Sequence, residues 1–248
     1  MAFITLMLAT TPLLAQGMQS NAPTSLEQVL KEVGKESRSL TAYKDAWTLN
    51  TVAGQQKVGM RVMRSIDGKR GAMGAFVNGN LLVLVGSNSK ESYFVLYPNR
   101  VYSKFATGNP WYDRGPNLST VGLQDGDLNI NFDGLYDLVV TSQPVLKLDA
   151  IENGLFEGKP CRIVRASAKR PTGSGVEFSM WLMKDKWIPL RVEANVTQRD
   201  GGKISFIGLR ERIETSAKFE SSEFDFPKDL VDGFKEEDWK RVVPGFAQ

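Results

Sequence analysis

Hydrophobic and polar residues first form a regular pattern after residue 24. Ser25 and Gln28 have the spacing of a capping box, which marks the start of a helix. Apolar residues then recur at the three- and four-residue spacing of one helix face, at Leu26, Val29, Leu30 and Val33. The pattern predicts an amphipathic helix over residues 25 to about 38, whose apolar stripe must cover another element.

From Ala46 onward the period changes to two. Asp67-Gly68 and Asn78-Gly79 have the composition of tight hairpin turns, in which Gly accepts a positive φ. Further strand patterns cover residues 46–53, 58–63, 81–85, 93–97, 101–105, 146–148, 161–168, 176–182, 188–196 and 204–208. Successive hairpins without helical crossovers predict an antiparallel sheet of about ten or eleven strands.

Several segments depart from this alternation. The pattern over residues 106–130 predicts a long irregular loop. Long loops in compact domains often carry functional residues. A second helix is expected from Phe132 to before Pro144, a turn at Asn153-Gly154, and a last strand at residues 224–226. The fold class is therefore mainly β with helical insertions.

The first 17 residues carry no charged side chain and end in small residues after an apolar run. This is typical of a secretory signal peptide, and cleavage after Gly17 would place small residues at the two positions that a signal peptidase reads. We therefore expect residues 1–17 to be a signal peptide, residues 18–248 to form one domain, and the mature chain to be periplasmic or secreted and soluble.

Composition narrows the chemistry. The 248 residues are 42% hydrophobic and 24% charged, which suffices for one large core, and the net charge of +3 is dispersed rather than clustered as nucleic-acid binding would require. The chain contains no His and one Cys, Cys161, so His-based catalysis, intrachain disulfides and thiolate zinc clusters are excluded. Cys161 lies in a strand pattern, where a free Cys is usually a small buried hydrophobe.

No motif indicates a cofactor or a metal ion. The alternating acidic and amide residues from Asp125 to Asp133 resemble a calcium loop, but Ile130 stands where an EF-hand needs Gly and Tyr136 where it needs Glu. A surface turn before a helix accounts for them better. Glycine-rich nucleotide-binding patterns are absent from the sequence. We expect no catalytic residue, no metal and no cofactor, and hence no enzyme.

Some strand patterns, such as residues 81–85 and 93–97, are apolar on both faces. Ordinary burial on both sides of the sheet explains this pattern. A sheet curled around an apolar cavity explains it equally well, and Met and aromatic side chains would then form a deformable lining.

The order of these elements resembles that of the LolA-like superfamily of periplasmic lipoprotein carriers. The segments that carry the resemblance follow the first amphipathic helix and are Phe76-Val77-Asn78-Gly79-Asn80-Leu81-Leu82, Tyr93-Phe94-Val95-Leu96-Tyr97-Pro98, Gly158-Lys159-Pro160-Cys161-Arg162-Ile163-Val164, residues 180–193, and Ser222-Glu223-Phe224-Asp225-Phe226-Pro227. The resemblance implies a curled antiparallel sheet, an unclosed β-barrel, covered by helices on its concave face. The segment from Arg64 to Gly74 lacks the aromatic-rich strand and Arg with which the carriers latch their lid, so no latch residue is carried over.

The resemblance, together with the apolar strands, predicts an exported carrier or sensor that binds a lipid, an acyl chain or a lipoprotein in an apolar cavity. The predicted lining consists of Met60, Val62, Leu82, Leu84, Phe94, Phe178 and Met180. Expected partners are a lipid or an acylated protein, and an envelope protein; nucleic acid is not expected, nor a transmembrane segment in the mature chain. The alternative is a protein-interaction module of the cell envelope without a bound lipid.

Overall fold

The computed structural model describes residues 23–106, 122–124, 127–129, 146–169 and 173–238. Within them, twelve strands form one sheet in the order β14-β6-β5-β4-β3-β2-β1-β13-β12-β11-β10-β9, and β7 and β8 form a separate hairpin. The elements, with their bounds, are α1 Leu26–Ser39, β1 Ala42–Ala53, β2 Gln56–Asp67, β3 Arg70–Val77, β4 Asn80–Ser87, β5 Glu91–Leu96, β6 Val101–Ala106, β7 Gly122–Gln124, β8 Asp127–Asn129, β9 Lys147–Phe156, β10 Lys159–Lys169, β11 Gly175–Met183, β12 Pro189–Thr197, β13 Lys203–Thr215, the 3₁₀ turns η1 Ser221–Phe224 and η2 Lys228–Leu230, and β14 Lys235–Glu236.

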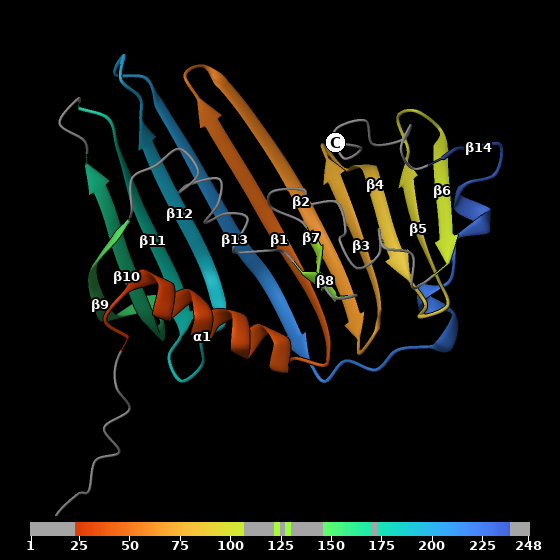
Figure 1. Cartoon of the computed structure of the whole chain (residues 1–248), viewed down its shortest axis with the longest axis horizontal. Coiled ribbons are helices and arrows are strands. Elements are labelled where there is room, and N and C mark those ends of the chain that lie inside the picture. Colours follow the sequence, from red (N-terminus) through yellow and green to blue (C-terminus); the bar gives the residue numbers. More distant parts are fainter. Residues whose placement is uncertain (1–22, 107–121, 125–126, 130–145, 170–172, 239–248) are drawn as a thin grey trace, which may run out of the picture.

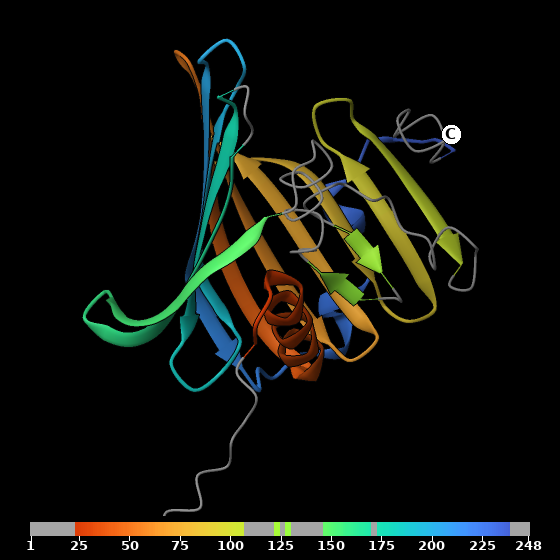
Figure 2. The ribbon, with the colours of Figure 1, turned by 60° about the vertical axis from the view of Figure 1, so that its left-hand side comes forward.

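The sheet is built from two meanders. Strands β1 to β6 pair in chain order, as do β9 to β13, and the antiparallel pairing of β1 with β13 joins the two runs (Figure 1). Among the described strands, only the two-residue strand β14 pairs in parallel, with β6. Figure 2 shows that the sheet curls without closing and that α1 and the β7–β8 hairpin lie inside the curl. The predicted fold class, an unclosed antiparallel sheet, is confirmed.

Helix α1 begins where the sequence predicts. Ser25 caps it, accepting a hydrogen bond from the backbone N–H of Gln28 at 3.2 Å, while the Gln28 side chain accepts one from the Thr24 N–H at 2.7 Å. The apolar stripe of α1 packs onto strands β10 to β12. This helix-side cluster comprises Leu26, Val29, Leu30, Val33, Leu146, Val164, Ala166, Ala168, Val176, Phe178, Met180, Leu182, Val192 and Ala194.

Two more clusters complete the core. The strand-side cluster lies on β1 to β5 and comprises Tyr43, Trp47, Leu49, Val62, Ile66, Met73, Ala75, Val85 and Phe94. The back cluster, Tyr93, Val95 and Val231, lies on the opposite face of β5, because neighbouring residues of a strand point to opposite sides. There the chain after β13 covers the sheet, and the ring of Phe226 meets that of Tyr93 edge-on at 5.6 Å.

Two sequence predictions about local structure are wrong. The chain does not turn at Asn153-Gly154, because β9 continues to Phe156 and turns at Glu157-Gly158. Gly154 faces Cys161 across the ladder, and a Cβ there would lie 2.5 Å from Cδ1 of Ile163, so this glycine makes room for a neighbour. Residues 224–226 are not a strand, since Phe224 ends the 3₁₀ turn η1.

The helix expected from Phe132 lies outside the described residues, as do the segment 1–17 and most of the stretch 106–130. Within the described part of the chain, α1 is therefore the helix that covers the concave face, and it covers the half formed by β10 to β12.

Candidate functional site

The helix-side and strand-side clusters lie on the same face of the sheet. Register shows this directly: Val62 faces Trp47, Trp47 faces Arg210, and further along β13 Phe206 faces Ala194. Partly buried Phe206 packs against both clusters and so connects them. The two apolar clusters thus share the concave face and meet at Phe206.

Beyond α1 this surface is less covered. Apolar side chains that are only partly buried pack against the strand-side cluster, namely Leu40, Met60, Val83, Leu96, Val101 and Phe206. Val58, which follows the same face of β2, is 60% exposed. Strand β8 contacts β2 and β3, and Met60 and Phe206 are among the side chains of this half that are only partly buried.

Five of the seven predicted lining residues share the concave face. Met60, Val62 and Phe94 belong to or pack against the strand-side cluster, and Phe178 and Met180 belong to the helix-side cluster. Phe178 and Met180 lie among the residues that contact the stripe of α1, and Met180 is fully buried. Val192 faces Met180 in the neighbouring strand.

Leu82 and Leu84 do not join this group. Leu84 faces Val95 and packs with the back cluster on the opposite side of the sheet. Leu82 falls at a β-bulge, where Ala75 faces Val83 but Phe76 faces Leu81, so no residue of β3 is its direct partner. The structure thus divides the predicted lining between two faces.

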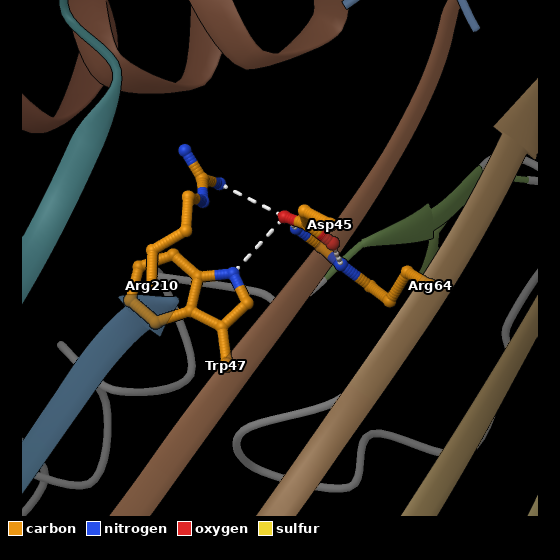
Figure 3. A network of polar contacts seen from close by, with 4 residues as sticks. All are labelled: Asp45, Trp47, Arg64 and Arg210. Carbon is orange, nitrogen blue, oxygen red and sulfur yellow. Dashed lines mark hydrogen bonds and ion pairs between the residues drawn. The ribbon is translucent and has the colours of Figure 1, made fainter. Parts of the chain in front are cut away.

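A buried ion cluster lies in the middle of the concave face, where β2, β1 and β13 run side by side (Figure 3). The carboxylate of Asp45 accepts hydrogen bonds from Nε and Nη2 of Arg64, at 2.8 and 2.5 Å, and from Nε1 of Trp47 at 3.0 Å. Nη2 of Arg210 forms an ion pair with the same carboxylate at 3.2 Å, and its guanidinium lies over the Trp47 ring, 4.5 Å from the centroid. All three charged side chains are almost completely removed from solvent.

Burial and mutual contact shift the ionisation of this cluster. Burial by itself would raise the pKa of Asp45, but the Arg64 guanidinium, together with Arg210, holds it below the usual value. Burial would lower the pKa of Arg64, and the Asp45 carboxylate raises it instead. Arg210 differs, because burial and the repulsion of Arg64 outweigh Asp45 and lower its pKa to about 10. At neutral pH the cluster therefore carries two positive charges and one negative charge.

The sequence prediction does not include this cluster, although the sequence contains a signal for it. Asp45 occupies an inward-facing position of its strand, on the same side as the apolar residues Tyr43, Trp47 and Leu49. Arg64 likewise occupies an inward-facing position of the next strand, between Val62 and Ile66. A charge in the phase that is otherwise apolar predicts either a buried ion pair or a functional residue.

Other chemistry is sparse in the described residues. Cys161 is buried in β10, as predicted, and burial raises the pKa of its thiol, so it remains protonated and unreactive at neutral pH. Across the described ranges, no three His, Cys, Asp or Glu side chains gather as metal ligands would. No helix in these ranges has the length and apolarity that a membrane crossing requires.

A cleft of about 390 Å³ lies elsewhere, at the ends of β10 to β13. Its lining mixes apolar and charged side chains, including Val176, Val196 and Ile204 beside Glu177 and Lys203. None of the seven predicted lining residues borders it.

Comparison with known proteins gives likeness in fold. No family model matches the chain, and no curated protein matches it in sequence. An uncharacterised conserved protein from Thermus thermophilus shares 13% identity at a TM-score of 0.45, over 85% of this chain and 97% of that one. A LolA superfamily protein from Nitrosomonas europaea shares 7% identity at a TM-score of 0.40, over 82% of this chain and 99% of that one. A LolA superfamily protein and a lipoprotein-sorting domain are thus among the solved structures to which this chain is similar.

A protein complex also matches. MucB in the MucA/MucB complex of Pseudomonas aeruginosa shares 10% identity at a TM-score of 0.42, and the match covers 82% of this chain and 62% of that one. At these identities and TM-scores the matches describe architecture and carry no argument about ligands.

Proposed function

We propose that the protein binds an apolar chain, such as the acyl chain of a lipid or lipoprotein, on the concave face of its sheet. The observation that carries the proposal is the continuity of the apolar surface past the edge of α1, through Phe206 to Met60 and Val58. Exposed apolar surface that is contiguous and enclosed by curvature is the common form of a lipid site.

Simple energetics support an apolar chain as the ligand. Each buried methylene contributes about 0.8 kcal/mol, so about ten methylenes contribute roughly 8 kcal/mol before the costs of ordering the chain. That suffices for useful affinity with few polar contacts. The proposal includes export, on the basis of the apolar segment at residues 1–17, and makes the protein a carrier or sensor rather than an enzyme.

A matched pair of charge substitutions tests the proposal. Met60 and Leu84 are both partly buried apolar residues, on strands two positions apart in the sheet, and they occupy opposite faces. We expect Met60→Asp to weaken the binding of a fluorescent fatty acid at least about tenfold, because one charge in the lining opposes an apolar chain. Leu84→Asp, the control, is expected to cost comparable stability and to leave the affinity within about twofold, since it acts on the other face.

Thermal melts of both variants separate loss of binding from loss of folding. Equal weakening by the two substitutions would contradict a site on the concave face. Mass spectrometry of a lipid extract from natively purified protein would then identify the bound species.

The edge strand β9 favours a second candidate, binding of an extended segment of an envelope protein. Within the described residues β9 pairs only with β10, and Leu155 near its end is 67% exposed. An open strand edge can accept one more strand. In this case Leu155→Lys would reduce cross-linking to a partner protein in cells and leave fatty-acid binding unchanged. Met60→Asp would reduce fatty-acid binding and leave the cross-linking unchanged.

A further inference from the structure

Arg210 is the least satisfied charged group in the buried ion cluster. Its side chain is 4% exposed, and its Nη2 forms the ion pair with Asp45. Nε and Nη1 are buried and have no hydrogen-bond partner among the residues that the structure describes. Figure 3 shows one terminal nitrogen of Arg210 turned toward Asp45 and the other pointing away from it. Buried donors without partners are rare, because each costs free energy that water or a protein acceptor would otherwise recover.

Asp45 cannot supply the missing acceptor. Its two oxygens already receive both donors of Arg64 and the indole N–H of Trp47, in addition to Nη2 of Arg210. With two guanidinium groups and one carboxylate, the cluster has a formal charge of +1 in a nearly dry environment. The lowered pKa of Arg210 reflects the same imbalance, since burial and Arg64 both disfavour its charge. One further negative charge beside Arg210 would balance the cluster.

The position of Arg210 relates this imbalance to the apolar surface. Arg210 lies on the concave face of β13, in line with Phe206, which connects the two apolar clusters. Trp47 stacks on its guanidinium and donates to Asp45, so the head of the side chain is fixed. A ligand that places an anionic head on Arg210 could extend its chain along the apolar surface on either side. Because the Arg210 side chain is almost completely buried, it favours a compact head over a bulky one.

We propose that Arg210 binds the carboxylate of a long-chain fatty acid, whose apolar chain lies on the concave face. This inference rests on the proposed function and specifies the head group of the ligand. Arg is suited to the role, because its planar guanidinium donates several hydrogen bonds in fixed directions and matches a carboxylate. Arg64 and Asp45 are positioning residues: they hold the cluster together and leave Arg210 with donors to spare.

A fluorescent fatty acid and its methyl ester test the inference on the delipidated full chain. We expect dansyl-undecanoic acid to bind the wild type at least about tenfold more tightly than its uncharged methyl ester. A tenfold difference in affinity corresponds to the weakest hydrogen bonds found between charged groups. Arg210→Met keeps much of the side-chain volume and removes charge and donors. This variant is expected to bind acid and ester equally, with the affinity that wild type has for the ester. Arg212→Met, an exposed residue of the same strand, is the matched control and should retain the wild-type preference.

Thermal melts distinguish a ligand-binding residue from a structural one. Because Arg210 is an undercompensated buried charge, we expect Arg210→Met to melt at or above the wild-type temperature. Equal binding of acid and ester by wild type, or a preference that survives in Arg210→Met, would overturn the inference and leave the apolar site standing. Absence of saturable binding of both probes would overturn the proposed function and the inference together. The wild-type comparison of acid and ester requires no variant, so a folding defect cannot obscure the outcome.

Discussion

Removal of the negative charge from the ion cluster should be one of the most destabilising single changes in the protein. Asp45→Asn keeps the shape of the side chain and leaves the guanidinium groups of Arg64 and Arg210 buried together without a counter-charge. Breaking a buried pair by removing one partner typically costs about 3–5 kcal/mol, and here one substitution removes the partner of two cations. We therefore expect a loss of at least about 3 kcal/mol in the free energy of unfolding.

The chain offers a matched control for this substitution. Glu211 on β13 bonds to Arg61 of β2 and to Thr48 of β1, so it spans the same three strands on the opposite, solvent-facing side. The side chain of Glu211 is 31% exposed, whereas that of Asp45 is 0% exposed. An exposed pair contributes about 0–1 kcal/mol, so Glu211→Gln should cost under about 1 kcal/mol.

Urea unfolding of wild type and both variants, followed by circular dichroism at neutral pH, measures the difference. A cost for Asp45→Asn that does not exceed that of Glu211→Gln would refute the reasoning. It would mean that the cluster is hydrated in solution or that the two arginines separate without penalty. The slope of free energy against urea concentration should stay the same in all three proteins, since each unfolds the same surface.

Three further experiments test the acid dependence of stability, the cap of α1 and the burial of Cys161. The pKa of Asp45 is lowered in the folded protein, so the ionised carboxylate stabilises the fold above the unfolded pKa of about 3.9, and this stabilisation is lost as the pH falls through the folded pKa. Urea unfolding at a series of acid pH values should show the loss in the wild type. A loss of the same size in Asp45→Asn would contradict this explanation. Ser25→Ala should cost about 1 kcal/mol in urea unfolding, because it removes the cap of α1; no change would mean that the Thr24–Gln28 contact suffices. Cys161 should react with a thiol reagent only slowly in the native protein and at once in urea, because it is buried and protonated; fast labelling of the native protein would show that β10 opens readily.

Strand periodicity is sufficient to predict the sheet, because turns and alternation are local properties of the sequence. Asn78-Gly79 shows this: both residues adopt positive φ, 51° and 79°, in a tight turn between β3 and β4. Asn153-Gly154 has the same composition but lies within a strand, because the side chain of Ile163, on the neighbouring strand, needs the space. A local pattern cannot distinguish a glycine that turns the chain from one that admits a distant neighbour.

The candidate site is predictable only in part, for a related reason. The run from Leu81 to Val85 is apolar at every position, so period two does not decide which residues face inward, and the sequence prediction places Leu84 on the wrong face. Arg210 is absent from the prediction because its partner Asp45 is distant in the chain and the two meet only through the pairing of β1 with β13. The charges within the apolar phase of β1 and β2 are the available clue.

The pairing of β1 with β13 also determines the order in which the molecule can be completed. Thr48 and Glu211, which meet across this pairing, are 163 positions apart in the chain, whereas the hairpins on either side form between near neighbours. Local hairpins close quickly and distant pairings slowly, so two half-sheets should form first and their joining should limit the rate of folding. Until they join, β1 has an unpaired edge in the middle of the future sheet. A chain in which the residues up to Thr215 are not yet available would therefore expose an aggregation-prone strand edge.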